Sequence, residues 1–267
     1  MAAQGRIAVT GKSDMDSLFA LCVRLFLLFL AYPGIAHSGP AADERRVTLE
    51  WTVDVDRVGH VASLEREGTS NIVLHEKLER DIVKWKFIPP LVNGKPATLR
   101  TRLVVQVGLI PNPDGETYAI HVRDVTTGGA LSRIRVPEYP GEEVGMLARG
   151  KQVALVAVEV AFDGNGKQVG VKLAEGSPLT SGEFVRRVKR ATRDWTYEPE
   201  RVDGKGIPGR VAYFICVVAH RPGESLDRQS DPCHWTPPGK HAVLGNGESL
   251  ALDSGAVLMT PVIGGIL

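Results

Sequence analysis

"WKFIPPLVNGKP" (residues 85–96) and "WTYEPERVDGKGIP" (residues 195–208) are two versions of one phrase in a single chain. Each reads tryptophan, any residue, aromatic, any residue, proline, and then passes through a valine to Asn/Asp-Gly-Lys and a later proline. The shared positions are Trp85, Phe87, Pro89 and Gly94 in the first copy and Trp195, Tyr197, Pro199 and Gly204 in the second. An internal repeat of this kind predicts that the chain contains one structural unit twice.

The stretch before each phrase has the pattern of two paired strands. Residues 47–55 (VTLEWTVDV) alternate apolar and polar side chains, which predicts a half-buried strand. A turn at 56–60 and a short second strand near 61–64 follow. In the later copy, residues 154–162 have the same β character and break at DGNG (163–166), which favours a hairpin. The segment QVGVKLA (168–174) then supplies the returning strand.

Each copy next changes to a helical period and then returns to a strand. The apolar residues Leu74, Leu78, Ile82 and Trp85, and likewise Phe184, Val188, Ala191 and Trp195, recur at helical spacing. The proline of the phrase ends each helix, and the Asn-Gly or Asp-Gly pair then turns the chain. A third strand follows, at 99–107 in the first copy and at 210–218 in the second. The predicted fold class is therefore α+β, with two tandem β-β-α-β units. Each unit is a three-stranded antiparallel sheet with one helix packed on one face.

The N-terminus predicts export from the cytoplasm. An apolar run at 18–31, interrupted by Arg24, is short for a membrane span, and Ala36-x-Ser38 resembles a signal-peptidase site. The true start is either Met1 or Met15, and retention of the run as an anchor stays an alternative. The predicted boundaries are a signal peptide at 1–38, a short linker at 39–46, a first unit at 47–109, a linker at 110–135, a second unit at 136–219 and an irregular C-terminal tail at 220–267.

Two cysteines remain after the predicted cleavage. Cys216 and Cys233 are an even pair for an oxidising compartment, so a disulfide between them is one interpretation. The other interpretation is two unpaired cysteines, with Cys216 buried in a strand. Sequence spacing leaves both open.

Composition and motifs argue against several function classes. The formal net charge is +1, which lacks the basic excess typical of nucleic-acid binding. Cys233, His234 and His241 do not have the paired spacing of a zinc site, so no metal is expected. Gly-x-Ser-x-Gly and His-Glu-x-x-His are absent from the sequence. We therefore expect a non-enzymatic protein with no cofactor.

The second copy resembles the TonB C-terminal domain family. The similarity includes the lead-in VPEYP at 136–140, with Tyr139 and Pro140, and continues through the last strand to residue 219. The first copy resembles the same domain more faintly. The resemblance implies a periplasmic module that grips an extended segment of an envelope protein, such as an outer-membrane TonB-dependent transporter, by β-augmentation. The implied binding edge is Arg210, Val211, Ala212, Tyr213, Phe214 and Ile215, and strand 100–107 would be its counterpart in the first copy.

Two alternatives remain beside this hypothesis. One is an anchored energy transducer of the TonB type, in which residues 18–31 stay in the inner membrane and the rest faces the periplasm. The other is a structural role, in which the sheet edges pair with each other within one chain or in a homodimer.

Overall fold

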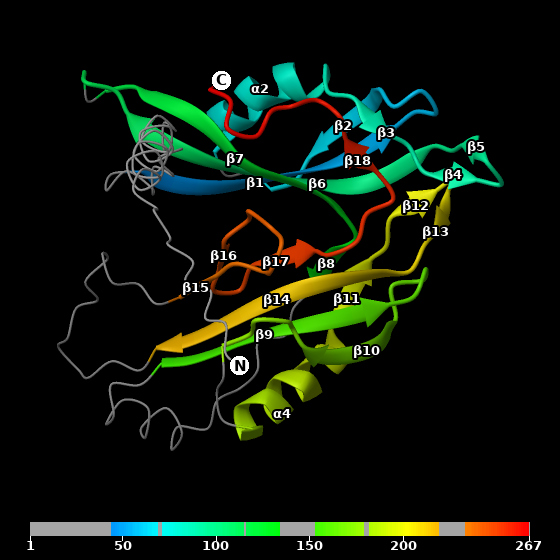
Figure 1. The fold of residues 1–267 in the computed structure, drawn as a ribbon, viewed down its shortest axis with the longest axis vertical. Helices are drawn as coiled ribbons and strands as arrows, with labels where there is room; N and C mark the ends of the chain where they lie inside the picture. The colour runs from blue at the N-terminus through cyan, green and yellow to red at the C-terminus, as the bar shows by residue number, and fades with distance from the viewer. Residues whose placement is uncertain are drawn as a thin grey trace, which may run out of the picture. The chain divides into compact units, whose positions relative to one another are not determined.

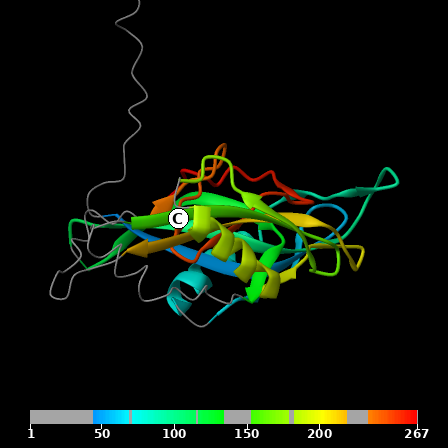
Figure 2. The same ribbon diagram turned by 90° about the horizontal axis from the view of Figure 1, so that it is seen from below.

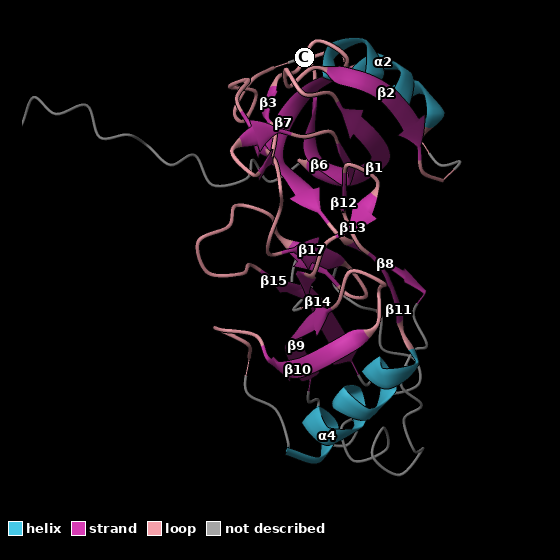
Figure 3. Ribbon diagram, turned by 90° about the vertical axis from the view of Figure 1, so that its right-hand side faces the viewer, coloured by secondary structure: helices cyan, strands magenta, loops and turns pink. Residues whose placement is uncertain are grey.

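The computed structural model describes residues 44–68, 71–114, 116–133, 153–178, 182–218 and 233–266. The chain from Asp43 to Leu267 forms one compact unit. In the described ranges this unit is mostly β-strand with two α-helices, so the predicted α+β class is confirmed. Figure 3 shows the strands lying between the two helices.

The first sheet is antiparallel and begins the unit (Figure 1). Its main strands are β1 (Arg45–Val55), β2 (Val61–Arg66), β6 (Leu99–Pro111) and β7 (Tyr118–Gly128). β1 lies between β2 and β6, and β7 pairs with the other side of β6. Helix α2 (Ile72–Ile82) follows β2 in the chain. The predicted linker 110–135 is therefore largely strand, because β7 and β8 (Ala130–Arg133) fall within it.

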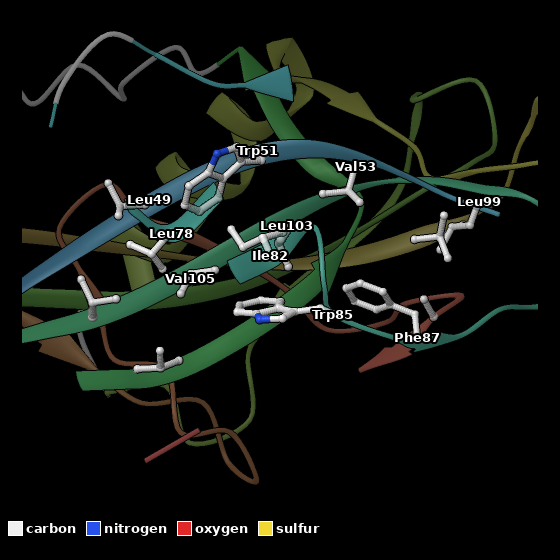
Figure 4. Close-up of a cluster of buried hydrophobic side chains, with 14 of the residues drawn as sticks. Leu49, Trp51, Val53, Leu78, Ile82, Trp85, Phe87, Leu99, Leu103 and Val105 are labelled. Carbon is white, nitrogen blue, oxygen red and sulfur yellow. The ribbon is translucent and has the colours of Figure 1, made fainter. Parts of the chain in front are cut away.

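The core of the first sheet follows from the alternation in β1. Leu49, Trp51 and Val53 are at most 1% exposed, and they share a cluster with Leu78 and Ile82 of α2. Figure 4 shows these side chains, with Trp85 and Phe87, gathered between the strands and the helix. The intervening residues of β1 form the polar face of the sheet.

The second sheet has the order β10-β9-β14-β17. Its strands are β9 (Val153–Phe162), β10 (Gln168–Leu173), β14 (Gly209–Val218) and β17 (Ser249–Ala251). Helix α4 (Gly182–Ala191) and the 3-10 turn η1 (Thr192–Asp194) follow β10 in the chain. Seen from below in Figure 2, α4 lies across the strands of this sheet, where Phe184 and Val188 join the core.

Short strands complete the fold. They are β3 (Phe87–Ile88), β4 (Leu91–Val92), β5 (Lys95–Pro96), β11 (Thr196–Glu198), β12 (Arg201–Val202), β13 (Lys205–Gly206), β15 (His234–Trp235), β16 (Leu244–Gly245) and β18 (Val257–Leu258). β12 pairs with the start of β6, which joins the two halves directly. β18 pairs with β3, and β11 pairs with β8.

The C-terminal tail, which was predicted to be irregular, contains short strands in its described residues 233–266. Trp235, Leu244 and Leu250 are buried in a third cluster, against Ala212 and Phe214 of β14. They cover the face of the second sheet that α4 leaves open. The apolar tail packs on the body because β14 is apolar on both faces and needs a second cover.

Candidate functional site

The hairpin turns of the two halves have matching hydrogen bonds. In the first, the Asp56 side chain accepts the amides of Val58 and His60, both at 2.9 Å. In the second, the Asp163 side chain accepts the amides of Asn165 and Lys167, also at 2.9 Å. An Asp that bonds to the backbone two residues on is a common way to fix a turn.

A glycine in each turn lies against the aromatic residue of the phrase. A Cβ on Gly59 would lie 2.0 Å from the Phe87 carbonyl oxygen, and one on Gly166 would lie 2.1 Å from that of Tyr197. Both glycines have positive φ, +86° and +78°. Any residue larger than glycine at either position would therefore clash with the backbone of the phrase.

The phrase residues occupy similar surroundings in both halves. Trp85 and Trp195 are 3% and 4% exposed. The predicted helical stripes run a few residues too far, to Trp85 and Trp195, because α2 ends at Ile82 and α4 at Ala191. Each tryptophan amide instead donates to the residue three positions earlier, in a tight turn beyond the helix. Pro89 and Pro199 follow the short strands β3 and β11, and Gly94 and Gly204 occupy turns with positive φ.

Strand β14 carries the predicted binding edge, Arg210 to Ile215, and five of its six residues are buried. Val211, Tyr213 and Ile215 face the α4 side, where Tyr213 meets Trp195 edge-on at 4.6 Å between ring centroids. Ala212 and Phe214 face the tail.

The edge of β14 is not free, which corrects the sequence-based expectation. β17 pairs with it antiparallel, matching Val211 with Ala251 and Tyr213 with Ser249. The Phe214 amide donates to the Glu248 carbonyl at 3.1 Å, and the Leu252 amide donates to the Arg210 carbonyl at 2.9 Å. We call residues 246–255 the strap, because they lie along this edge.

Charged and polar contacts hold the ends of the strap. Arg210 makes two hydrogen bonds of 2.6 Å to Asp253 and one of 3.1 Å to Glu159. The Asp253 hydrogen bond is the main cause that raises the pKa of Arg210 above its ordinary value. At the other end, the Asn246 side chain accepts the Cys216 amide at 2.8 Å.

A disulfide joins β14 to the start of the described tail. Cys216 and Cys233 are bonded, with their Cα atoms 5.3 Å apart and 17 residues of separation. Of the two interpretations left open by the sequence, the structure has the paired one. The bond lies at the strand end beyond the strap, beside Trp235 and Leu244.

Glu200 links the strap to the first sheet. It is 5% exposed, and its carboxylate accepts bonds from Thr101 Oγ1 at 2.6 Å, Ser254 Oγ at 3.0 Å and the Gly255 amide at 2.6 Å. Burial raises the pKa of Glu200 above its ordinary value, although the three hydrogen bonds oppose the shift. This one side chain therefore contacts β6 and the strap together.

We expect Glu200→Ala to lower the free energy of unfolding by about 3 kcal/mol, because three donors lose their buried acceptor. Glu200→Gln should cost less, since its amide oxygen still accepts one bond. The pKa of Glu200 is higher in the folded protein than its ordinary value of 4.5, so the folded state holds this proton more tightly than the unfolded state does. The stability that this proton contributes is lost as the pH rises above 4.5. The Gln variant should therefore gain stability relative to the native protein between pH 4.5 and neutrality. Urea unfolding across pH measures this, and a pH-independent difference would contradict it.

The corresponding edge of the first half is covered more extensively. β6 pairs with β7 from Arg102 to Pro111, and β12 pairs with its start at Leu99 and Arg100. The predicted counterpart edge, residues 100–107, is therefore also paired on both sides. β2 and β10 lie at the ends of their sheets.

Other predicted features lie outside the described residues. These are Tyr139, Pro140 and the apolar run 18–31. Where the structure describes the chain, no helix combines the length and the apolar character needed to cross a bilayer. The same ranges contain no group of three or more His, Cys, Asp or Glu residues placed to hold a metal ion.

Comparisons of the chain with protein-family models, with curated proteins and with solved structures find no match.

Proposed function

We propose that this protein is a non-enzymatic periplasmic binding module of the TonB C-terminal type, built from two β-β-α-β units. It recognises an extended segment of an envelope protein by β-augmentation at the edge of β14. The strap occupies this edge when no guest is bound. A segment of an outer-membrane transporter is the guest that the sequence resemblance favours.

The matched turns support the proposal of two copies. The Asp56 and Asp163 turns, the Gly59 and Gly166 contacts and the buried tryptophans recur in the same order around each phrase. Such a set of contacts at corresponding places is what duplication of one unit would leave.

The observation that carries the binding proposal is the pairing of β17 with β14. The edge accepts an extended antiparallel segment, and the paired length is only Ser249–Ala251. The charged contact between Arg210 and Asp253 is 45% and 42% exposed on its two sides, so it adds little stability by itself. The short pairing and this half-exposed contact favour local opening of the strap over global unfolding, while the buried bonds from Ser254 and Gly255 to Glu200 oppose it.

Proline substitutions in the strap test this directly. Leu252→Pro removes an amide that donates to Arg210, so the strap should open more often. Ser249→Pro is the matched control, because alternation along an antiparallel pair turns the Ser249 amide away from β14. The probe is a labelled peptide with the strap sequence NGESLALD (246–253), measured by fluorescence anisotropy. We expect Leu252→Pro to bind it about fivefold or more tightly than the native protein, the equivalent of one lost hydrogen bond.

The controls decide what the peptide result means. Ser249→Pro should bind like the native protein, and peptides from short extended segments of outer-membrane transporters should compete with the probe. If Leu252→Pro remains folded by circular dichroism and does not bind the strap peptide more tightly than the native protein does, the edge of β14 is not a guest site.

A structural role is the second candidate, and one observation favours it. The last strand of each half, β6 and β14, is paired on both sides within the chain. Paired edges protect a sheet from association with other chains. In this role the strap would open only when the whole protein unfolds. Measuring whether the strap opens by itself therefore separates the two candidates.

A further inference from the structure

Basic side chains gather on the outer side of helix α4. Figure 1 shows this helix on the outside of the second sheet, and its buried residues pack against the strands. Arg186, Lys189, Arg190 and Arg193 follow one another at spacings of three and four residues, so they share the side of the helix that faces away from the sheet. The three arginines are exposed and the lysine is half-buried. We call these four residues the basic face.

The charges of the basic face are not neutralised by acidic neighbours. Glu183, the acidic residue of α4, forms a salt bridge of 3.0 Å with Arg187, which lies outside the basic face. Among the residues that the structure describes, no carboxylate lies within salt-bridge distance of the four basic side chains. Together α4 and η1 contain five basic and two acidic residues, a net charge of +3. The whole chain carries +1, so the remaining residues carry −2 and the positive charge is concentrated here.

The corresponding helix of the first half has no such face. Helix α2 contains two basic and three acidic residues, a net charge of −1. Counting back from the tryptophan of each phrase, Arg186 and Lys189 correspond to Glu76 and Glu79. The β-β-α-β arrangement therefore forms without a basic helix, and the basic face is a feature of the second half alone.

The layout of the charges selects the partner. The basic face extends over about 10 Å along the helix axis, so a single small anion cannot contact all of it. Its side chains share one side of the helix, so a flat surface that carries many anionic groups can meet them together. The exposed residues of α4 and η1 include no aromatic side chain on which a nucleic-acid base could stack. We propose that the basic face docks the protein on a membrane surface that is rich in anionic phospholipid.

This docking is electrostatic and does not insert the helix into the bilayer. Phe184 and Val188, the buried apolar residues of α4, are already packed in the core of the second sheet. Attraction between basic residues and anionic lipid decays within a Debye length, so it weakens as salt is added. The inference is independent of guest binding, because the basic face includes no residue of β14 or of the strap.

The test is sedimentation of the full chain with lipid vesicles at low salt. We expect the chain to bind vesicles of phosphatidylcholine mixed equally with phosphatidylglycerol, and not vesicles of phosphatidylcholine alone. In the triple variant Arg186→Gln, Arg190→Gln, Arg193→Gln, binding to the mixed vesicles should weaken about a hundredfold, because each Lys or Arg near such a surface contributes about fivefold. Raising the salt to about 0.5 M should release the native chain, because that concentration shortens the Debye length to a few ångströms.

A matched variant removes the same charge from the first half. Arg80, Lys84 and Lys86 are exposed, and their joint replacement by Gln should leave vesicle binding nearly unchanged. Glutamine has nearly the helix propensity of lysine and arginine, so both triple variants should melt like the native protein. The α4 variant should also bind the strap peptide as the native protein does, so a failure of docking and a failure of guest binding are separate results.

Four results would overturn the proposal. The first is the absence of binding to the mixed vesicles, and the second is equally tight binding to phosphatidylcholine alone. The third is equal weakening in both triple variants, since net charge and not the basic face would then be responsible. The fourth is tighter binding of a DNA oligonucleotide or of polyglutamate than of the mixed vesicles, which would assign the basic face to another class of partner.

Discussion

Gly166→Ala should lower the free energy of unfolding by at least about 3 kcal/mol, because the new Cβ meets a backbone atom in a strained conformation. Its Cβ would lie 2.1 Å from the Tyr197 carbonyl oxygen, and the backbone φ is +78°. A carbonyl in a paired strand cannot move aside as a flexible side chain can. Urea unfolding monitored by tryptophan fluorescence gives the loss.

Gly204→Ala is the matched control for this substitution. Gly204 has φ +79°, and nothing lies within 4 Å of a Cβ built there. The control therefore measures the cost of positive φ alone, about 1–2 kcal/mol. The pair Gly59→Ala and Gly94→Ala repeats the comparison in the first half, with a contact of 2.0 Å in one and open space in the other. If the two alanine variants of either pair lose the same free energy of unfolding, the close contact between the hairpin turn and the phrase is absent in that half.

Trp195→Ala should cost about 3 to 5 kcal/mol, as other truncations of large buried aromatics do. The indole is 4% exposed and meets Tyr213 edge-on at 4.6 Å. Its loss removes both buried apolar area and an aromatic pair on β14, the strand that carries the proposed binding edge. Thermal unfolding of the full chain measures the change.

Trp195→Phe separates the two contributions. It keeps an aromatic ring near Tyr213 and should cost clearly less than the alanine variant. A loss below about 1 kcal/mol for Trp195→Ala would contradict the placement of the indole in the core, because surface substitutions have effects of that size.

Much of the strand and helix pattern could be read from local periodicity. The alternation in residues 47–55 and the turn at 163–166 reported burial and chain reversal directly, and both appear in the structure. Helix ends were less accurate, because the apolar stripe continues through a tight turn to Trp85 and Trp195 after the helical bonding has ended. Periodicity does not distinguish a helix from the turn that follows it.

The cover on β14 was missed although a signal for it exists. Residues 209–218 (GRVAYFICVV) are apolar on both alternating sets, which is typical of a strand buried on two faces. A single helix covers only one face, so a second cover had to come from elsewhere in the chain. The apolar residues of the tail, including Leu244 and Leu250, supply it. Which segment would do so depends on long-range pairing that local patterns do not encode.

Hydrogen exchange at β14 tests the central claim most directly, namely that the strap holds a guest edge reversibly. The Phe214 and Leu252 amides form hydrogen bonds between β14 and the strap. The Tyr213 and Ile215 amides point the other way, toward β9, because amides alternate in direction along a strand. The account predicts that the first two exchange at least about tenfold faster than the second two, because the strap opens while the β9–β14 ladder stays closed. If all four amides exchange at the same rate, and only through global unfolding, the strap does not open by itself. That result would contradict the account and make the strap a permanent strand of the sheet.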